Sequence, residues 1–281
     1  MPDMRPSVSV LILTLNEERN IGQCIDSLSG FADIVVLDSF STDQTCEIAR
    51  QKGARVIQRK FDNWAAHQNW AVDNIDFAHR WVFYLDADER MTDELRAEIA
   101  AIADDPARSE VAFYCGRRNY FMGKWIRHAM PPSMIMRFFL PKRVRFDRLV
   151  NPVPVIDGPH GYLKAMFDHY NFSKGLSEWI DKHNKYSQLE AMEGMKVLRG
   201  ARLGISDLFT RDPLRRRRAL KDLSFSMPFR PALKFFWMYI LQGGFLDGRA
   251  GLTYCKLQAM YEYMIVIKMR ELARTEKGLP T

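Results

Sequence analysis

Cysteine is scarce in this sequence, and the cysteines present follow no metal-binding or disulfide pattern. No two of them form a CxxC pair, and long segments separate all four: Cys24, Cys46, Cys115 and Cys255. We therefore expect neither a structural zinc site nor a disulfide framework. This cysteine usage fits a protein of a reducing cytoplasm.

Long apolar runs and leader signals are also lacking. The first residues show neither a basic leader with a long apolar stretch nor a small-residue cleavage site, so we expect no signal peptide. The most apolar later segment, Phe235 to Leu241, is much shorter than the roughly 20 residues that span a bilayer. Any membrane association is therefore expected to be peripheral.

The sequence has no GxxxxGK(S/T) phosphate loop and no recognisable nucleic-acid-binding motif, which argues against a nucleic-acid partner. Its 41 Lys and Arg residues exceed its 34 Asp and Glu residues, for a formal net charge of +7. This excess favours anionic partners such as phosphates or acidic lipids without choosing among them. With 281 residues and 47% hydrophobic content, the chain can bury a full core.

Strand and helix patterns alternate through the first part of the chain. Residues 8–13 form a continuous apolar run, typical of a strand buried on both faces, and Asn16 is expected to cap the next helix. Further strands are predicted at 34–37, 54–59 and 81–85, and further helices at 45–52, at 64–73 and after Thr92. This alternation predicts an α/β fold, a doubly wound and mostly parallel sheet with helices on both faces.

The sharpest chemical signal is Asp86 and Asp88, two carboxylates two positions apart at the end of a buried strand. Both can approach one divalent cation and a diphosphate bound to it. Such a pair is also common as a solvated turn or helix cap. The residues of the neighbouring loops are therefore needed to choose between a metal site and an ordinary turn.

Two other predicted strands end in polar side chains. Asp38 opens a loop rich in Ser, Thr and Asp, while Thr14, Asn16 and Glu17 follow the first strand. Because the carboxyl ends of parallel strands meet at one edge of a sheet, we expect these side chains to converge with Asp86 on one crevice. Any one of them alone is more often an ordinary cap or turn.

Together these stretches resemble the family 2 glycosyltransferases, whose nucleotide-sugar fold is called GT-A. The matching segments are VSVLILTLNEERNI, IVVLDSFSTDQTCEIARQKGARVI, HQNWAVDN and WVFYLDADER. The chain looks most like the branch that builds lipopolysaccharide core and exopolysaccharide. The resemblance implies a nucleotide-sugar-binding half at 7–115 and an acceptor-binding half at 116–200, and we expect a C-terminal helical, membrane-associating region at 201–281.

Carried over position by position, the resemblance implies three sets of site residues. The nucleotide of a donor, expected to be a UDP-sugar, would contact Thr14, Asn16, Glu17, Asp38 and Ser41, with Gln68 at the edge of the pocket. Asp86 and Asp88 would hold the diphosphate and a divalent metal, Mg²⁺ or Mn²⁺. His169 stands where the family has a further metal ligand, although a lone histidine is more often structural.

The catalytic base is the point at which the sequence departs from the family. This branch often has a His-Glu pair where the present chain has Asn151 and Pro152. Asp147, Asp157 and Asp168 are the nearby substitutes, and each of them also fits a turn or salt bridge. If a base is present, the resemblance implies transfer with inversion and no covalent glycosyl-enzyme.

The C-terminal part carries a basic run, Arg215 to Arg218, shortly before an aromatic segment that starts near Phe229. Basic residues beside an apolar surface suit a helix that lies on anionic lipid, although a solvated helix face or nucleic acid would use the same residues. We expect peripheral binding at the cytoplasmic face of a bacterial inner membrane, where a lipid-linked acceptor lies.

The leading hypothesis is an inverting glycosyltransferase of bacterial cell-surface polysaccharide synthesis, either of lipopolysaccharide or of exopolysaccharide. The alternative is a catalytically silent protein of the same fold that only binds nucleotide-sugars, because Pro152 stands where a base is expected. Intact Asp86 and Asp88 favour the enzyme, since a silent site needs no metal ligands.

Overall fold

The computed structural model describes residues 6–147, 152–200, 210, 216, 219–220 and 223–280. The chain forms two compact units. The first contains residues 1–120 and 131–173, and the second contains residues 121–130 and 174–281. The three functional segments predicted from the sequence remain a proposal. A division into compact units does not show which segment binds a donor, an acceptor or a lipid.

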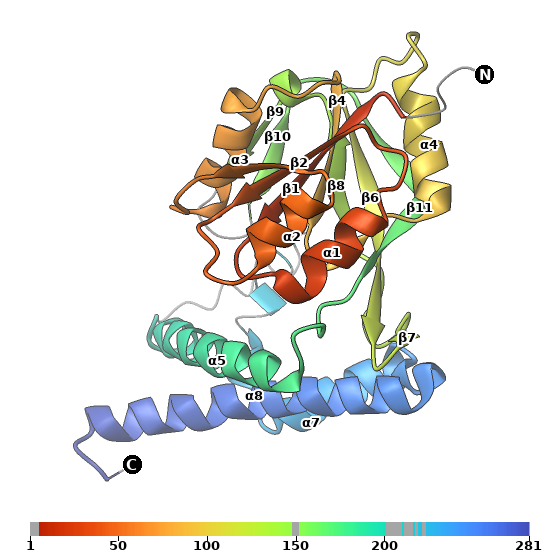
Figure 1. Cartoon of the computed structure of the whole chain (residues 1–281). Coiled ribbons are helices and arrows are strands. Elements are labelled where there is room, and N and C mark those ends of the chain that lie inside the picture. Colours follow the sequence, from red (N-terminus) through yellow and green to blue (C-terminus); the bar gives the residue numbers. More distant parts are fainter. Residues whose placement is uncertain are drawn as a thin grey trace. The chain divides into compact units, whose positions relative to one another are not determined.

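A mixed, mostly parallel sheet forms the centre of the first unit (Figure 1). Its strand order is β3-β2-β1-β4-β8-β6-β11-β5, with β7 paired to β6. The strands β1 to β4 are mutually parallel, β11 is parallel to β6, and β8 runs antiparallel to both of its neighbours. The strands are β1 (Val8–Thr14), β2 (Asp33–Asp38), β3 (Arg55–Gln58), β4 (Trp81–Asp86), β5 (Glu89–Arg90), β6 (Ala112–Phe121), β7 (Lys124–Trp125), β8 (Met134–Phe139) and β11 (His160–His169).

Helices cover both faces of this sheet, as predicted. Along β1, Val10 and Ile12 join a core cluster with residues of α1, α2 and α4, while Leu11 and Leu13 join a second cluster with residues of α3. This alternation follows from the two-residue period of a strand. The helices are α1 (Glu18–Asp26), α2 (Thr45–Gln51), α3 (Trp64–Asn74) and α4 (Asp93–Ala103). The predicted doubly wound α/β fold is confirmed.

One of the two predicted helix caps is wrong. Asn16 does not cap α1, because its φ of 54° lies in the left-handed region and Glu17 occupies the N-cap position. Its Oδ1 instead accepts a hydrogen bond from the backbone N–H of Thr42 at 2.8 Å. The second cap is confirmed, since the hydroxyl oxygen of Thr92 accepts from the N–H of Leu95.

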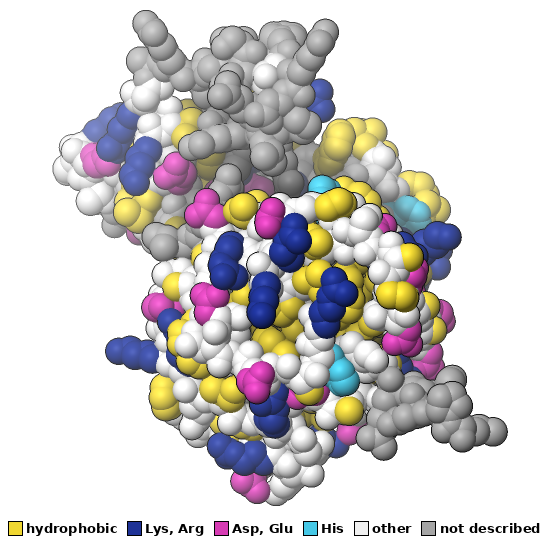
Figure 2. All heavy atoms as spheres, turned by 90° about the horizontal axis from the view of Figure 1, so that it is seen from above, with side chains coloured by type: hydrophobic (Ala, Val, Ile, Leu, Met, Phe, Trp, Pro, Cys, Tyr) yellow, Lys and Arg dark blue, Asp and Glu magenta, His cyan; other side chains and the backbone are white. Residues whose placement is uncertain are grey.

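A short antiparallel pair, β9 (Val144–Asp147) and β10 (Val153–Ile156), follows the 3-10 turn η1 (Pro141–Arg143). Asn69 of α3 fixes β9, because its side chain exchanges two hydrogen bonds of 2.8 Å with the backbone of Phe146. A hollow of about 570 Å³ lies at the edge where β4 begins, lined by residues 75–80 and 140–143. Figure 2 views the chain from this side, and Lys and Arg side chains lie around an apolar hollow there.

The second unit is helical, which confirms the predicted C-terminal helical extension. Its core contains Ala191, Phe225, Ile265 and Met269. Among the described residues, no helix combines the length and apolarity needed to span a bilayer. The elements are α5 (Leu176–Arg199), α7 (Arg230–Phe236), the π-helical turn η3 (Trp237–Leu241), the 3-10 turn η4 (Gly244–Asp247) and α8 (Gly248–Glu276).

Candidate functional site

Three strand ends meet at one edge of the sheet, as the sequence predicted. In the parallel register, Thr14 at the end of β1 lies beside Asp38 at the end of β2. On the other side of β1, Leu13 lies beside Asp86 at the end of β4. The polar loops that follow β1, β2 and β4 therefore start at neighbouring points of one edge, where ligands of such sheets bind.

Asp38 organises the loop that follows β2. Its carboxylate has no exposed surface and accepts hydrogen bonds from the hydroxyl of Thr14 at 2.8 Å, the N–H of Ser41 at 2.8 Å and the side chain of Gln58 at 3.2 Å. Burial opposes ionisation, but these hydrogen bonds outweigh it and hold the pKa of Asp38 below its usual value. In this conformation Asp38 fixes the loop geometry, and direct contact with a nucleotide stays a prediction.

The loop after β1 is tied to the loop after β2 by reciprocal hydrogen bonds. The N–H of Asn16 donates to the Ser41 hydroxyl at 2.8 Å, and the N–H of Glu17 donates to the Thr45 hydroxyl at 2.7 Å. The Glu17 carboxylate accepts from the side chain of Asn20. All five residues predicted to contact the nucleotide thus belong to one connected set of loops.

Phe40 is a residue of this edge that sequence reasoning missed. Its side chain is 55% exposed, and its φ of 61° lies in the left-handed region, which is unfavourable for a bulky residue. Large aromatic side chains exposed by a strained backbone are found at ligand sites. The signal in the sequence was a lone Phe within the small polar loop DSFSTD.

Gln68 lies in the buried part of α3, and its Oε1 has no hydrogen-bond partner among the described residues. Its neighbour His67 connects α3 to the loop after β2, with Nε2 3.4 Å from the Ser39 hydroxyl and Nδ1 2.9 Å from a guanidinium nitrogen of Arg59. Burial, together with the charge of Arg59, lowers the pKa of His67. A neutral imidazole therefore stands beside Gln68 at this edge.

Asp86 is held by two partners at the end of β4. The Tyr84 hydroxyl donates to its Oδ1 at 2.6 Å, and Arg137 Nη2 of β8 donates to its Oδ2 at 2.7 Å. The same nitrogen of Arg137 reaches Glu89 Oε1 at 2.7 Å, and Glu89 Oε2 accepts from the N–H of Asp86 at 2.9 Å. One buried guanidinium therefore holds the turn that contains Asp86 and Asp88, called the DxD turn below.

Arg137 and Glu89 are both almost fully buried, and the sequence analysis assigned a role to neither. Burial, with the negative charges of Asp86 and Asp88, raises the pKa of Glu89, while the charge of Arg137 opposes that rise. The guanidinium also lies over the Tyr84 ring, 4.3 Å from its centre. The available signal was a single Arg inside the apolar strand MIMRFFL.

Asp88 faces His169, the histidine that the family resemblance predicts as a metal ligand. His169 Nε2 lies 3.4 Å from Asp88 Oδ2, and its Nδ1 lies 2.9 Å from Asn119 Oδ1. Burial opposes ionisation of Asp88, but the hydrogen bond and charge of His169 hold its pKa below the usual value. With Nδ1 beside the Asn119 amide oxygen, Nε2 of His169 faces a carboxylate oxygen of Asp88.

That arrangement fits a divalent cation, because a carboxylate and a neutral imidazole whose other nitrogen is hydrogen-bonded are an ordinary ligand pair. Asp86 is less available, since both of its oxygens have protein partners. Over the described parts of the chain, no group of three or more His, Cys, Asp or Glu side chains is arranged to hold a metal ion.

The three candidate bases lie in different places. Asp157 follows β10 and pairs at 3.0 Å with Arg143, the last residue of η1, at the edge where β4 begins. The structure therefore does not support Asp157 as the base, because the DxD turn is at the other end of β4. Asp168 of β11 is bound to Arg118 at 2.5 Å, and burial raises its pKa although Arg118 opposes this.

Asp147 is exposed at the end of β9. This strand starts near Arg143 and runs along α3 towards the edge where α3 begins, which is the side of the loops after β1 and β2. Asp147 is followed by residues 148–151, so the predicted departure at Asn151 lies outside the described residues. The basic run from Arg215 to Arg218 lies outside them too, apart from Arg216.

The chain matches the family model described as Glycosyl transferase family 2 over residues 9–170, more than half of its length. The lipopolysaccharide core biosynthesis glycosyltransferase LpsC of Rhizobium meliloti (strain 1021) is 25% identical over 277 residues, which cover 93% of this chain and 91% of LpsC. The uncharacterized glycosyltransferase RT0209 of Rickettsia typhi is 35% identical over 96 residues, which cover 34% of this chain and 32% of that protein.

Solved structures with a similar fold are more distant. The crystal structure of S. aureus TarS 1-349 aligns with a TM-score of 0.41 at 15% identity, covering 96% of this chain and 91% of TarS. Glucosyl-3-phosphoglycerate synthase from Mycobacterium tuberculosis, in complex with Mn²⁺, UDP and glucosyl-3-phosphoglycerate, aligns with a TM-score of 0.31 at 21% identity, covering 42% of this chain and 45% of that one. Likenesses this distant assign no donor, acceptor or metal to the present chain.

Proposed function

The chain belongs to glycosyl transferase family 2 and is a glycosyltransferase, and we propose that it moves a sugar from a nucleotide-sugar to a glycan or lipid-linked acceptor. The acceptor would belong to a bacterial cell-surface polysaccharide, and the nearly full-length similarity to LpsC favours lipopolysaccharide core. The observation that carries the proposal is the convergence of the β1, β2 and β4 ends, which brings the donor loops beside the DxD turn. Release of nucleoside diphosphate from a donor, coupled to glycosylation of an acceptor, is the experiment that tests it.

The donor would lie across the edge formed by these loops. Thr14, Asn16, Glu17 and Ser41 surround the position proposed for the nucleotide, with Gln68 at its border and Asp38 setting the loop geometry. A uridine diphosphate donor is the nucleotide that we propose first. The diphosphate would extend towards Asp88, which stays ionised in the fold because its pKa is lowered.

Asp88 and His169 are the residues that would hold a divalent cation, with Asp86 supporting them through its link to Arg137. Bound there, Mg²⁺ or Mn²⁺ would offset the negative charge that develops on the departing diphosphate. The protein's own contribution is positional: Asn119 orients the imidazole, and Arg137 holds the DxD turn.

The proposed reaction is a single displacement with inversion. A base removes the proton from an acceptor hydroxyl as its oxygen attacks the anomeric carbon from the face opposite the diphosphate. The bond from that carbon to the diphosphate oxygen breaks, and its electron pair leaves with the nucleoside diphosphate. Comparing the anomeric configuration of donor and product by NMR tests inversion, and retention of configuration would exclude this mechanism.

Asp147 is the carboxylate that we propose as the base. Asp147→Asn is expected to lower kcat for transfer by about a hundredfold or more, with donor affinity unchanged, because only proton removal from the acceptor is lost. Asp157→Asn is the matched control and should keep wild-type kcat, since Asp157 lies at the other edge with Arg143. Steady-state transfer assays on both variants decide between them, and equal rates for both would remove Asp147 from this role.

Phe40 is proposed to stack on the base of the nucleotide. Phe40→Gly should weaken nucleotide binding by about tenfold, because base stacking is lost, while the free energy of unfolding stays equal or rises by about 0.5 kcal/mol, because Gly tolerates the positive φ. Calorimetric titration and urea unfolding measure the two effects. A lower free energy of unfolding together with an unchanged affinity for the nucleotide would show that Phe40 has only a structural role in packing.

The proposed site of action is the cytoplasmic face of the inner membrane, where the chain would bind peripherally. Its formal charge of +7 favours anionic lipid headgroups. The sequence placed this contact near the basic run of residues 215–218, most of which the structure does not describe.

A further inference from the structure

An apolar stripe lies on the outer side of a helix in the second unit. The elements α7 and η3 form one continuous helix from Arg230 to Leu241. Its exposed large side chains are three or four positions apart, which is the spacing of one helix face: Leu233, Phe236, Trp237, Ile240 and Leu241. The other side is anchored, since Met238 is buried and Arg230 Nε lies 2.7 Å from Glu262 Oε2 of α8. Met238 and the ion pair of Arg230 with Glu262 fix the opposite side of the helix to the rest of the unit, so the stripe faces solvent.

Further apolar side chains extend the stripe at both ends. Phe229, just before the helix, is 82% exposed and has a φ of 56°. A bulky residue in the left-handed region carries a conformational cost, so the backbone holds this ring outside against local preference. After the helix, η4 exposes Phe245 and Leu246 to about half.

The hairpin between β6 and β7 presents another apolar side chain. Met122 at its tip is 69% exposed, and both Met122 and Gly123 have positive φ, at 51° and 72°. Two-residue hairpin turns with positive φ at both positions normally carry Asn, Asp or Gly at the first, not Met. Of the four non-glycine residues with positive φ in the described ranges, two lie in the donor loops and two are Met122 and Phe229.

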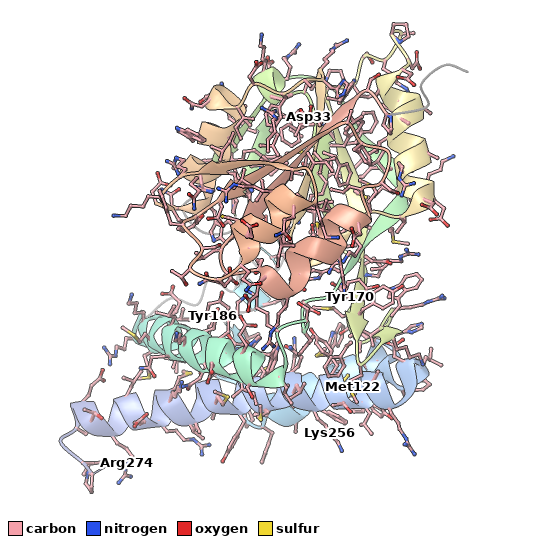
Figure 3. The ribbon with its side chains drawn as sticks, in the orientation of Figure 1. Asp33, Met122, Tyr170, Tyr186, Lys256 and Arg274 are labelled. Atoms are coloured by element: carbon pink, nitrogen blue, oxygen red, sulfur yellow. The ribbon has the colours of Figure 1, made fainter. Side chains whose placement is uncertain are left out.

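The hairpin and the helix are joined into one body through Asp247 of η4. Its buried carboxylate accepts from the N–H groups of Arg127 at 3.1 Å, His128 at 2.9 Å and Ala129 at 2.8 Å. Lys124 Nζ adds a hydrogen bond of 3.0 Å to the Asp247 carbonyl. Figure 3 labels Met122 near the hairpin tip and Lys256 on α8 of the same unit.

Within residues 121–130 and 223–261, the exposed charged side chains are all cationic. Between Leu223 and Tyr261 the one acidic residue is Asp247, which is buried, and the segment 121–130 has none. The cationic side chains of these two segments, apart from the buried Arg230, are Lys124, Arg127, Lys234, Arg249 and Lys256. Apolar side chains with cations and no exposed acid complement a bilayer surface whose headgroups carry negative charge.

We propose that the hairpin 122–127, the segment 229–241 and η4 form the surface that docks this enzyme on an anionic phospholipid bilayer. The exposed aromatic and aliphatic side chains enter the headgroup region, and the lysines and arginines contact lipid phosphates. This deepens the peripheral membrane binding proposed above, and it is independent of the donor site because every residue involved lies in the second unit.

The test is co-sedimentation of the full chain with phosphatidylcholine vesicles that either contain or lack phosphatidylglycerol. Wild type should bind the anionic vesicles, and Leu241→Ser with Leu246→Ser should weaken that binding by at least about tenfold, because two large apolar side chains are lost from the contact. Arg127→Gln with Lys234→Gln should lower affinity for the anionic vesicles by about tenfold without affecting neutral ones.

The matched control is Leu189→Ser with Leu198→Ser, two exposed leucines of α5 in the same unit, which should bind vesicles like wild type. Equal weakening by both leucine pairs, or no binding of wild type to anionic vesicles, would overturn the proposal. A dimer in light scattering that the Leu241 and Leu246 changes dissociate would also overturn it, in favour of a second copy as the occupant. Donor hydrolysis measured without vesicles should be normal in all these variants, so this result is separable from the proposed chemistry.

Discussion

Asp88→Asn is expected to lower the turnover number for sugar transfer by about a thousandfold, the size of effect seen when one electrostatic contact to a developing charge is removed. The carboxylate of Asp88 remains ionised in the fold and faces His169 across 3.4 Å. An amide has nearly the same shape but no charge, so the residue could no longer hold a cation beside the diphosphate. Release of nucleoside diphosphate at saturating donor and metal measures the effect.

The structural effect of the same substitution should be small. Asp88 is partly exposed, so the free energy of unfolding should stay within about 1 kcal/mol of wild type. Asp104→Asn is the control, because Asp104 is an exposed carboxylate at the far end of α4. Wild-type turnover in Asp88→Asn would exclude the proposed metal and diphosphate role.

Arg137→Met should be the most destabilising single change near the site, by about 3–5 kcal/mol, because it leaves a buried carboxylate without its partner. Glu89 is fully buried, and Arg137 Nη2 joins it to Asp86 with two contacts of 2.7 Å. Adding Glu89→Gln should recover part of the loss, since the neutral side chain no longer needs a counter-charge. Urea unfolding of the three proteins measures both effects.

The loss of folding stability in Arg137→Met should depend on pH, and the direction of the change can be predicted. Burial raises the pKa of Glu89 above its unfolded value, so the folded state binds this proton more tightly than the unfolded state. Removing Arg137 raises that pKa further, so the stability deficit should shrink as the pH falls from the pKa of Glu89 in the variant to its lower pKa in wild type. A deficit that is the same at every pH would show that packing, not charge, causes it.

Local patterns were enough to predict the strand ends of the donor edge. A buried strand followed by polar residues identifies its own carboxyl end, and parallel pairing then brings Thr14, Asp38 and Asp86 together. The confirmed α/β fold rests on the same logic. Asn16 failed as a cap because a residue favoured at helix starts also tolerates the left-handed region.

The parts that could not be predicted depend on contacts between distant segments. Arg137 is 51 positions from Asp86, and Asn119 is 50 positions from His169, so neither partnership has a local signature. Its position in the sequence made Asp157 a candidate base. Because β8 is antiparallel to β4, the chain that follows it places Arg143 and its partner Asp157 at the edge where β4 begins, away from the DxD turn. The exposed stripe of residues 233–241 has the same helical spacing as a core-facing helix, and only its exposure distinguishes the two.

The most direct test of the central claim is calorimetric titration of UDP-, GDP- and dTDP-sugars into the protein, with Mn²⁺ and then with a chelator. The account predicts binding of one nucleotide class, UDP-sugars first, that is lost with chelator and in Asp88→Asn. No binding of any donor by folded protein, or the same affinity with and without metal, would contradict a metal-dependent donor site at this edge of the sheet.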